Sequence, residues 1–394
     1  MNDNMTLLLQ KLDSVVVFRN ISDGDVISSL RRLLSSREDR RRVRLYSDFV
    51  SALFSYSTCL GEYLSDALAR DENIYVTRRA EGVEIPPTLR YCVESELSVF
   101  SELSTLTPEE LWSFVGASGY LPRFDTEKHD FVSEYEERMK NVSVLGYGIY
   151  ASSVMFHWRN GNIVPVATPD ATDVSHLYCY ESERQKLIDN TLSFLEGKPA
   201  ANALLCGDAG TGKSSSIKAV TNLFAPRGLR LVELRKEDIR DIPAIMGVLR
   251  KNPLKFILFI NDLSFSSDDD NFSALKAILE GSASVQSPNT IIYVTSNRRH
   301  LVKESFSDRD GDDVHRNDTM EELLSMSERF GLVILFVKPS KKTYLEIVHN
   351  IFMERGMPEP DEKLDVEACA FALRKGGFTP RAAEQFADEK FARG

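Results

Sequence analysis

The sequence predicts an α/β protein in which a parallel sheet, flanked by helices, carries a phosphate-binding loop. Three observations predict this fold class. Apolar runs of strand length alternate with helical patterns over residues 203–337, which is typical of βαβ units. The spacing G-x-x-x-x-G-K-S occurs at Gly207–Ser214, directly after the first of these runs. Helical periodicity prevails before residue 105 and after Lys341, so we expect a mostly helical N-terminal domain and a C-terminal helical lid.

The composition is that of a folded protein with room for more than one domain. The chain has 394 residues, of which 42% are hydrophobic and 27% charged, which are ordinary values for a globular protein. A formal net charge of −11 argues against a protein that coats nucleic acid non-specifically. The five cysteines form no C-x-x-C pair, so we expect neither a disulfide framework nor a zinc site.

We expect a cytoplasmic protein without a membrane segment. Lys11 and Asp13 interrupt the apolar residues near the N-terminus, whereas a signal peptide has an unbroken apolar core. No apolar run reaches the length of about 20 residues that spans a bilayer. The scattered cysteines also fit a reducing compartment.

Shifts in periodicity divide the chain into four expected parts. Residues 1–145 form a mostly helical N-terminal domain, and 146–175 form a short β segment and linker. Residues 176–340 form the α/β nucleotide-binding domain, and 341–394 form the helical lid. In the first part, Thr107-Pro-Glu-Glu110 predicts a helix start, with Thr as N-cap, Pro at the first helical position and Glu at the third.

Arginines are concentrated in one stretch of the N-terminal domain. We favour a solvated face and a helix–helix connection, because Glu38 and Asp39 partly neutralise the stretch. The alternative is a contact for nucleic acid or for an acidic partner. The arginines are Arg31, Arg32, Arg37, Arg40, Arg41, Arg42 and Arg44.

Strands and helices are expected to alternate from Gly146 onward. Tyr147–Trp158 and Ile163–Val166 predict two strands around a turn at Asn160–Asn162. Ligands of parallel α/β sheets bind at the carboxyl ends of the strands. Further strands are expected at residues 203–206, 229–234, 256–260, 290–295 and 332–337, with helices at 182–195, 215–224, 242–249 and 272–279.

Gly207–Ser214 has the sequence of a phosphate-binding P-loop. Its glycines let the backbone turn tightly and direct several N–H groups at one phosphate, and the following helix adds the positive end of its dipole. Lys213 is expected to reach the β- and γ-phosphates of ATP, and the Ser214 hydroxyl to ligate Mg²⁺. The residues expected to bind the nucleotide are Gly207, Asp208, Ala209, Gly210, Thr211, Gly212, Lys213, Ser214 and Ser215.

The polar residues that follow the apolar run Phe256–Ile260 are candidates for the acidic groups that hold Mg²⁺ and orient water in such ATPases. In the register that we favour, Asn261 takes the metal-side place and Asp262 acts as general base. An uncharged amide then stands where an acid is usual. In the alternative register Asp262 holds the metal, Leu263 takes the place of the base, and hydrolysis is slow. The residues expected at the metal are therefore Ser214, Asn261 and Asp262.

Three further residues are candidates for catalysis. Asn297 ends the strand that begins near Thr290, where its amide could position the attacking water or sense the γ-phosphate. Arg329 could be an arginine finger that is donated to the nucleotide of an adjacent subunit. Arg381, at the start of a lid helix, could report on the γ-phosphate. Each residue alone is more often a strand cap or a surface ion pair, and their order after a P-loop favours the functional interpretation.

This order of motifs resembles that of the AAA+ ATPases, over residues from about 176 to the end of the chain. More narrowly, the chain resembles a bacterial AAA+ group catalogued as domain of unknown function 815, and this narrower resemblance takes in the region 147–158. The stretches that carry it are Pro165–Asp170, Gly207–Ser214, Ala225–Arg230, Phe256–Phe265, Thr295–His300 and Ser327–Leu332.

The resemblance implies an AAA+ fold and a role for each motif residue. Asn261 departs from the family's pattern of two acids, which bears on the rate of hydrolysis more than on ATP binding. The family carries no settled biological role, so the resemblance names no substrate. The implied roles are ATP and Mg²⁺ binding for Lys213 and Ser214, the Walker B place for Asp262, sensor 1 for Asn297, the finger for Arg329 and sensor 2 for Arg381.

Two classes of function are expected alternatives. In the first, a homo-oligomer hydrolyses ATP with Arg329 acting in trans, and the conformational change remodels an unknown protein or nucleic-acid client. In the second, the protein is a nucleotide-gated switch or adaptor with marginal hydrolysis because of Asn261. A third option is a loader of nucleic-acid machinery that uses the arginines between Arg31 and Arg44.

Overall fold

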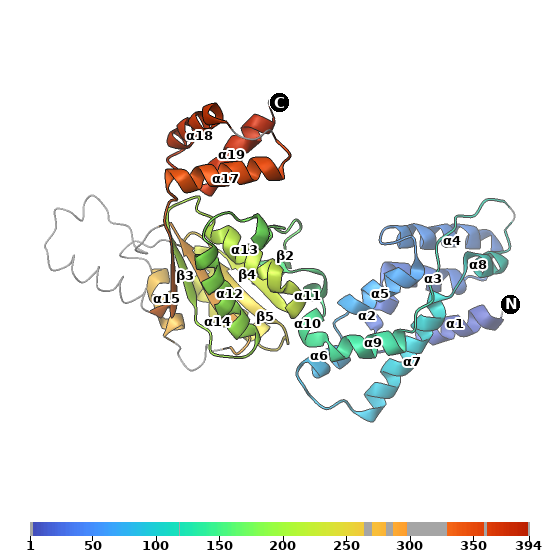
Figure 1. The fold of residues 1–394 in the computed structure, drawn as a ribbon. Helices are drawn as coiled ribbons and strands as arrows, with labels where there is room; N and C mark the ends of the chain where they lie inside the picture. The colour runs from blue at the N-terminus through green and yellow to red at the C-terminus, as the bar shows by residue number, and fades with distance from the viewer. Residues whose placement is uncertain are drawn as a thin grey trace. The chain divides into compact units, whose positions relative to one another are not determined.

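The computed structural model describes residues 3–117, 119–263, 270–280, 287–297, 329–357 and 361–392, and Figure 1 shows the ribbon. The chain divides into two compact units, Met1–Ser152 with Lys251–Leu254, and Ser153–Arg250 with Lys255–Gly394. The expected fold class is confirmed, because along the sequence a mostly parallel sheet follows a helical N-terminal region and precedes C-terminal helices.

The described part of the first unit is helical, as the periodicity predicts. Its apolar stripes are buried: Val26, Leu30 and Leu33 have no exposed surface. Thr107 and Glu110 form the expected capping box at the start of α8. The helices are α1 (Asp3–Asp13), α2 (Arg19–Asp23), α3 (Asp25–Leu34), α4 (Asp39–Phe54), α5 (Leu60–Arg70), α6 (Ile74–Ala80), α7 (Pro87–Ser104), α8 (Pro108–Val115), α9 (Phe131–Lys140), α10 (Val142–Leu145) and α11 (Ile149–Ser152).

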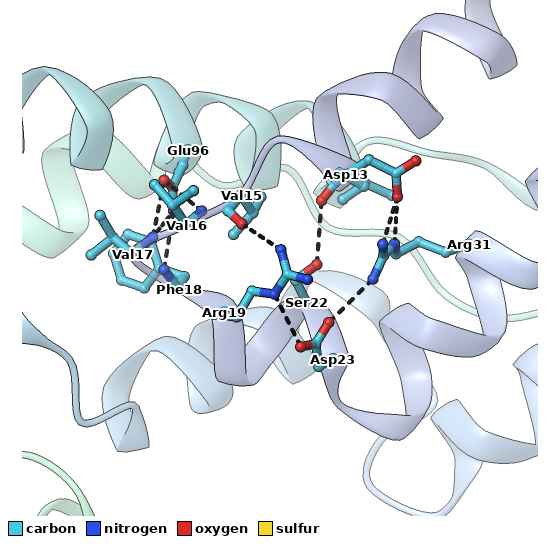
Figure 2. A network of polar contacts seen from close by, with 11 residues as sticks. Asp13, Val15, Val16, Val17, Phe18, Arg19, Ser22, Asp23, Arg31 and Glu96 are labelled. Carbon is cyan, nitrogen blue, oxygen red and sulfur yellow. Dashed lines mark hydrogen bonds and ion pairs between the residues drawn. The ribbon is translucent and has the colours of Figure 1, made fainter.

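A buried carboxylate on α7 holds the segment between α1 and α2 (Figure 2). Glu96 is 6% exposed, and its two carboxylate oxygens accept the backbone N–H groups of Val16, Val17 and Phe18 at 3.0–3.1 Å. These N–H groups precede the first turn of α2, where no intrahelical acceptor is available. Glu96, although distant in the sequence, therefore supplies acceptors for the backbone N–H groups of the segment that leads into α2.

The arginine stretch is partly internal to the first unit. Arg31 on α3 donates to Asp13 and Asp23, which are also drawn in Figure 2. The Arg42 guanidinium lies 4.3 Å from the centroid of the Phe114 ring and donates to the Phe114 carbonyl oxygen at 3.1 Å. These contacts support the interpretation of the stretch as a helix–helix connection.

Seven strands of the described residues form one sheet in the order β2-β1-β4-β5-β6-β3-β7. All neighbouring pairs are parallel except β1 with β2, which form an antiparallel hairpin. Their apolar runs are buried on both faces in the middle of the sheet, which is typical of a parallel sheet covered by helices. The strands are β1 (Met155–Arg159), β2 (Asn162–Pro165), β3 (Ala203–Gly207), β4 (Leu229–Leu234), β5 (Lys255–Ile260), β6 (Thr290–Ser296) and β7 (Leu332–Phe336).

The prediction of a strand from Tyr147 was wrong at its start. Residues Ile149–Ser152 form α11, and β1 begins only at Met155. Gly146 and Gly148 have φ of 70° and 58°, and these left-handed conformations interrupt an extended chain. The two strands at 155–165 extend the same sheet as the P-loop strand.

Helices α12 and α13 cover one face of the sheet. Leu187 of α12 and Ile217 of α13 are fully buried in one core with Leu205 of β3 and Phe259 of β5. The remaining elements of this unit are η1 (Val174–His176), α12 (Glu181–Leu195), α13 (Lys213–Phe224), η2 (Ala225–Arg227), η3 (Lys236–Asp241), α14 (Ile242–Leu249), α15 (Asp270–Leu279), α17 (Lys341–Glu354), α18 (Glu362–Arg374) and α19 (Pro380–Phe391).

The last three of these helices, drawn in red in Figure 1, form the lid. They have their own core, in which Tyr344, Ile347, Phe371 and Phe386 are buried. Thr379 caps α19 by accepting the N–H of Ala382 at 3.1 Å, with Pro380 at the first helical position. This capping fixes where α19 begins and hence where Arg381 lies.

Candidate functional site

The loop Gly207–Ser214 joins the carboxyl end of β3 to the start of α13. Gly207 has φ of 131°, and a Cβ at this residue would lie 2.0 Å from the backbone oxygen of Phe336 on β7. Gly212 has φ of 88° and directly precedes α13. Gly207 is therefore required for close packing against β7, and Gly212 for a left-handed turn.

Backbone N–H groups of the loop are available to an anion. Among the described residues, the N–H groups of 209–213 donate no hydrogen bond to a protein atom. The loop is held by other contacts: Asp208 N–H donates to Phe336 O at 3.1 Å, and the Thr211 hydroxyl donates to Asp208 O at 2.8 Å. Together with the positive end of α13, these N–H groups form a donor set that fits the phosphates of a nucleotide.

Lys213 is buried in the loop and points its ammonium at acceptors of the site. Its Nζ donates to Gly207 O at 3.1 Å, to Asp208 O at 2.7 Å and to Asn297 Oδ1 at 3.0 Å. Burial lowers the pKa of the Lys213 ammonium below its ordinary value, and the Asp262 carboxylate opposes this shift. The structure thus brings Lys213 and Asn297 together, as expected for a site that surrounds a γ-phosphate.

Ser214 lies against Asn261, which follows β5. The Ser214 hydroxyl donates to Asn261 Oδ1 at 2.7 Å, and the Thr295 hydroxyl of β6 donates to the same oxygen at 2.9 Å. Two oxygens, one from Ser214 and one from Asn261, therefore face each other, which is a donor set that suits a hard cation such as Mg²⁺. This arrangement matches the register in which Asn261 takes the metal-side place.

Asp262 lies on the other side of the site, beside Asn297. Asn297 Nδ2 donates to Asp262 Oδ1 at 2.5 Å. Asp262 has φ of 54°, a left-handed conformation that is uncommon for a residue with a side chain and is often found at functional sites. Asn261 and Asp262 therefore project to different partners although they are adjacent in the sequence.

Arg381 of the lid lies beside the P-loop. Its backbone N–H donates to Gly210 O at 3.4 Å, and its Cβ would be 3.4 Å from a Cβ built at Gly210. A cavity of about 70 Å³ is lined by Gly210, Ser215, Tyr178, Arg381 and Glu384 among others. This cavity is smaller than the roughly 300–1,000 Å³ of common ligand pockets, because α19 lies close to the P-loop.

Arg329 lies away from the P-loop of its own chain. Its Nε donates to Glu280 Oε1 at 2.7 Å, at the end of α15. It precedes Leu332, which pairs with Ala203 at the amino end of β3, whereas Gly207 pairs with Phe336 at the carboxyl end. Strands rise about 3.3 Å per residue, so Arg329 lies near the amino ends of the strands and the P-loop lies at their carboxyl ends.

Two contact residues of the site were missed by the sequence reasoning. The sequence places Thr295 in a strand and in the family-like stretch Thr295–His300 without a role, although its place two residues before Asn297 puts both on one face of the strand. Lys338 follows β7; its N–H donates to Asp208 Oδ2 at 3.2 Å and its Nζ to Gly376 O at 2.8 Å. Lys338 thus contacts both the P-loop and the lid. Residues 264–265, 298–300 and 327–328 of the family-like stretches lie outside the described residues.

The described residues contain no group of three or more His, Cys, Asp or Glu side chains that could hold a metal ion by themselves. They also contain no helix long and apolar enough to cross a membrane.

Comparison with known proteins gives one family match and a remote structural likeness. A family profile described as "Protein of unknown function (DUF815)" matches residues 151–394. Among solved structures, the chain is similar to the Thermotoga maritima RuvB Holliday junction branch migration motor, with 17% identity and a TM-score of 0.35. That likeness covers 54% of this chain and 61% of the other, so the chain spans less than two thirds of that protein. No curated protein matches the chain.

Proposed function

The chain belongs to the family described as "Protein of unknown function (DUF815)", and from that premise we propose that it is an AAA+-type ATPase. It binds ATP with Mg²⁺ at the P-loop and hydrolyses it. The family description names no activity, so the proposal rests on the chemistry of the site.

The observation that carries the proposal is the convergence of Lys213, Asp262 and Asn297 at the carboxyl ends of adjacent strands. Lys213 Nζ and Asp262 Oδ1 each lie within 3.0 Å of an atom of the Asn297 amide. A cation, a general base and an amide are the groups that phosphoryl transfer to water uses. The free N–H groups of residues 209–213 add the phosphate cradle.

Each residue has a distinct task in this proposal. The Lys213 ammonium exchanges its carbonyl partners for oxygens of the β- and γ-phosphates. Asp262 accepts a proton from the attacking water, and Asn297 orients that water. Ser214 and Asn261 hold Mg²⁺, which would neutralise charge on the phosphates. Arg381 contacts the γ-phosphate from the lid.

Arg329 acts on the nucleotide of a neighbouring subunit in this proposal, so activity needs a homo-oligomer. Arg329 lies near the amino ends of the strands, whereas its own P-loop lies at their carboxyl ends, and this separation supports action in trans. The client that the oligomer remodels is a protein or a nucleic acid.

The test is ATP turnover measured against protein concentration, with solution mass recorded on the same samples. Turnover per subunit should rise as the protein assembles. Lys213→Ala and Arg329→Ala should each lower it by about 10²-fold or more. Lys218→Ala, on the same helix as Lys213, is the matched control and should retain turnover. Equal turnover in the wild type and in both variants would sink the proposal.

A nucleotide-gated switch is a second candidate, and Asn261 is the observation that favours it. An amide oxygen beside Ser214 offers the metal a ligand without charge, so nucleotide would bind while hydrolysis stays marginal. In this case Asn261→Asp should raise turnover sharply. If Asn261→Asp leaves a slow turnover unchanged, the amide is not what limits hydrolysis. Tight ATP binding by a monomer without turnover would favour the switch over the motor.

A further inference from the structure

We propose that Thr295 is a positioning residue whose hydroxyl orients the amide of Asn261, so that its oxygen rather than its nitrogen faces Ser214 and the metal. The inference rests on the proposed Mg²⁺–ATP site. It adds a residue that keeps the oxygen of an uncharged side chain directed at the metal.

Thr295 is fixed between the two residues that follow β5. It is 1% exposed on β6, and its backbone oxygen accepts the N–H of Leu263 at 2.7 Å. Its hydroxyl oxygen accepts the N–H of Asp262 at 2.9 Å and donates to Asn261 Oδ1 at 2.9 Å. One hydroxyl therefore contacts both the metal-side amide and the backbone of the candidate general base.

The direction of the second hydrogen bond follows from the first. A backbone N–H can only donate, so the Thr295 oxygen is an acceptor toward Asp262 and has one proton left to give. Within the described part of the chain, the only acceptor recorded for that proton is Asn261 Oδ1. Turning the amide by 180° would leave a buried hydroxyl proton without an acceptor and would set two N–H groups against Ser214.

The need for such a residue is specific to asparagine. A carboxylate presents oxygen whichever way it is turned, whereas an amide presents oxygen in one orientation and a donor in the other. A donor in the metal-side place would repel a cation. Thr295 thus compensates for the loss of an acid at position 261, and its effect should depend on which residue is there.

The experiment measures how much Mg²⁺ strengthens nucleotide binding, with a fluorescent ATP analogue titrated into the full chain in EDTA and in MgCl₂. The variants are Thr295→Val, Thr295→Ser, Asn261→Asp and the double variant Asn261→Asp/Thr295→Val. Valine keeps the shape of threonine, and thermal unfolding checks that each variant is folded. Thr290→Val, at the other end of β6, is the matched control.

With Asn261 present, Thr295→Val should reduce the Mg²⁺-dependent gain in affinity by about 10-fold, the effect of a buried hydrogen bond left unmade. Thr295→Ser and Thr290→Val should keep the gain. With Asp at position 261, Thr295→Val should have little effect on it. This dependence between two contacting residues is what a double-mutant cycle measures.

The inference is overturned if Thr295→Val leaves the Mg²⁺-dependent gain unchanged, or if it lowers the gain equally in both backgrounds, as a purely structural role would. Failure of the proposed function gives a different result, because the wild type itself would then bind no nucleotide analogue in either buffer. That result would overturn both.

Discussion

At the scale of single residues, two of the three loop glycines, Gly207 and Gly212, are needed for different physical reasons. Gly207→Ala should lower the free energy of unfolding by about 3 kcal/mol or more, because its Cβ would meet the Phe336 oxygen at 2.0 Å. Gly212→Ala should cost about 1–2 kcal/mol, since a Cβ there finds no atom within 4 Å and only the left-handed φ of 88° is unfavourable. Urea unfolding of both variants checks the order, and equal losses would contradict it.

The sequence predicts candidate residues for the chemistry, and it does not predict which of them contact one another in the fold. Lys213 and Ser214 follow from the spacing within one loop, because a few consecutive residues form the phosphate cradle. The contacts of Lys213 with Asn297, and of Ser214 with Asn261, depend on β6 lying between β5 and β3. Alternation of strands and helices predicts a parallel sheet and not the order of its strands, so Thr295 was not recognised as a contact of Asn261.

At the scale of secondary-structure elements, Tyr293 attaches α12 to β6. Its hydroxyl interacts with Thr191 at 2.7 Å and with Asn190 at 3.1 Å, and burial raises its pKa from the ordinary 10.0 to about 12. The folded state therefore favours the neutral phenol. The resulting contribution to stability is present below pH 10 and is lost as the pH rises toward 12.

We therefore expect the effect of Tyr293→Phe to depend on pH. At pH 7 the variant should be less stable by about 1 kcal/mol, the net value of a buried hydrogen bond. At pH 11 the raised pKa of Tyr293 lowers the unfolding free energy of the wild type alone by roughly 1.4 kcal/mol, so the variant should be as stable as the wild type or slightly more stable. Urea unfolding at the two pH values measures this, with the exposed Tyr120→Phe as control. A deficit that is the same at both pH values would contradict the assignment.

Glu96 of α7 gives a second element-scale prediction. Glu96→Gln replaces one acceptor oxygen by a donor that faces the N–H groups of Val16, Val17 and Phe18. The first unit should lose about 2–3 kcal/mol of unfolding free energy. Glu94→Gln, exposed on the same helix, should change it by less than about 0.5 kcal/mol. Denaturant midpoints of the two variants decide the matter, and similar midpoints would show that the buried contacts of Glu96 contribute little.

Strands were predicted best where a run of mostly apolar residues corresponds to a strand buried on both faces of the sheet. The strands at 229–234 and 256–260 were predicted within a residue of their observed bounds, because both are almost fully buried and most of their side chains are apolar, with Arg230 and Glu233 as the exceptions. The strand expected from Tyr147 was mistaken because apolar and aromatic residues continue through Gly146 and Gly148. Only their left-handed backbone, which the sequence permits without requiring, ends the extended conformation there.

At the scale of the whole molecule, the position of Arg329 away from the P-loop of its own chain leads to a mixing test of action in trans. Lys213→Ala and Arg329→Ala chains should each be inactive alone. A one-to-one mixture should recover about a quarter of wild-type turnover, because about one contact in four joins an intact P-loop to an intact finger. Turnover of the mixture no higher than that of the separate variants would exclude a finger shared between subunits. Mixing wild type with Lys218→Ala controls for dilution.

The closeness of α19 to the P-loop predicts an order of events in nucleotide binding. Arg381 N–H on Gly210 and the Lys338 contacts hold the lid against a space of about 70 Å³. If ATP binds at this P-loop as we propose, we expect its entry to require movement of the lid away from the loop. In rapid-mixing experiments, the observed rate of association should rise with nucleotide concentration and then level off, and the plateau would be the rate at which the lid opens.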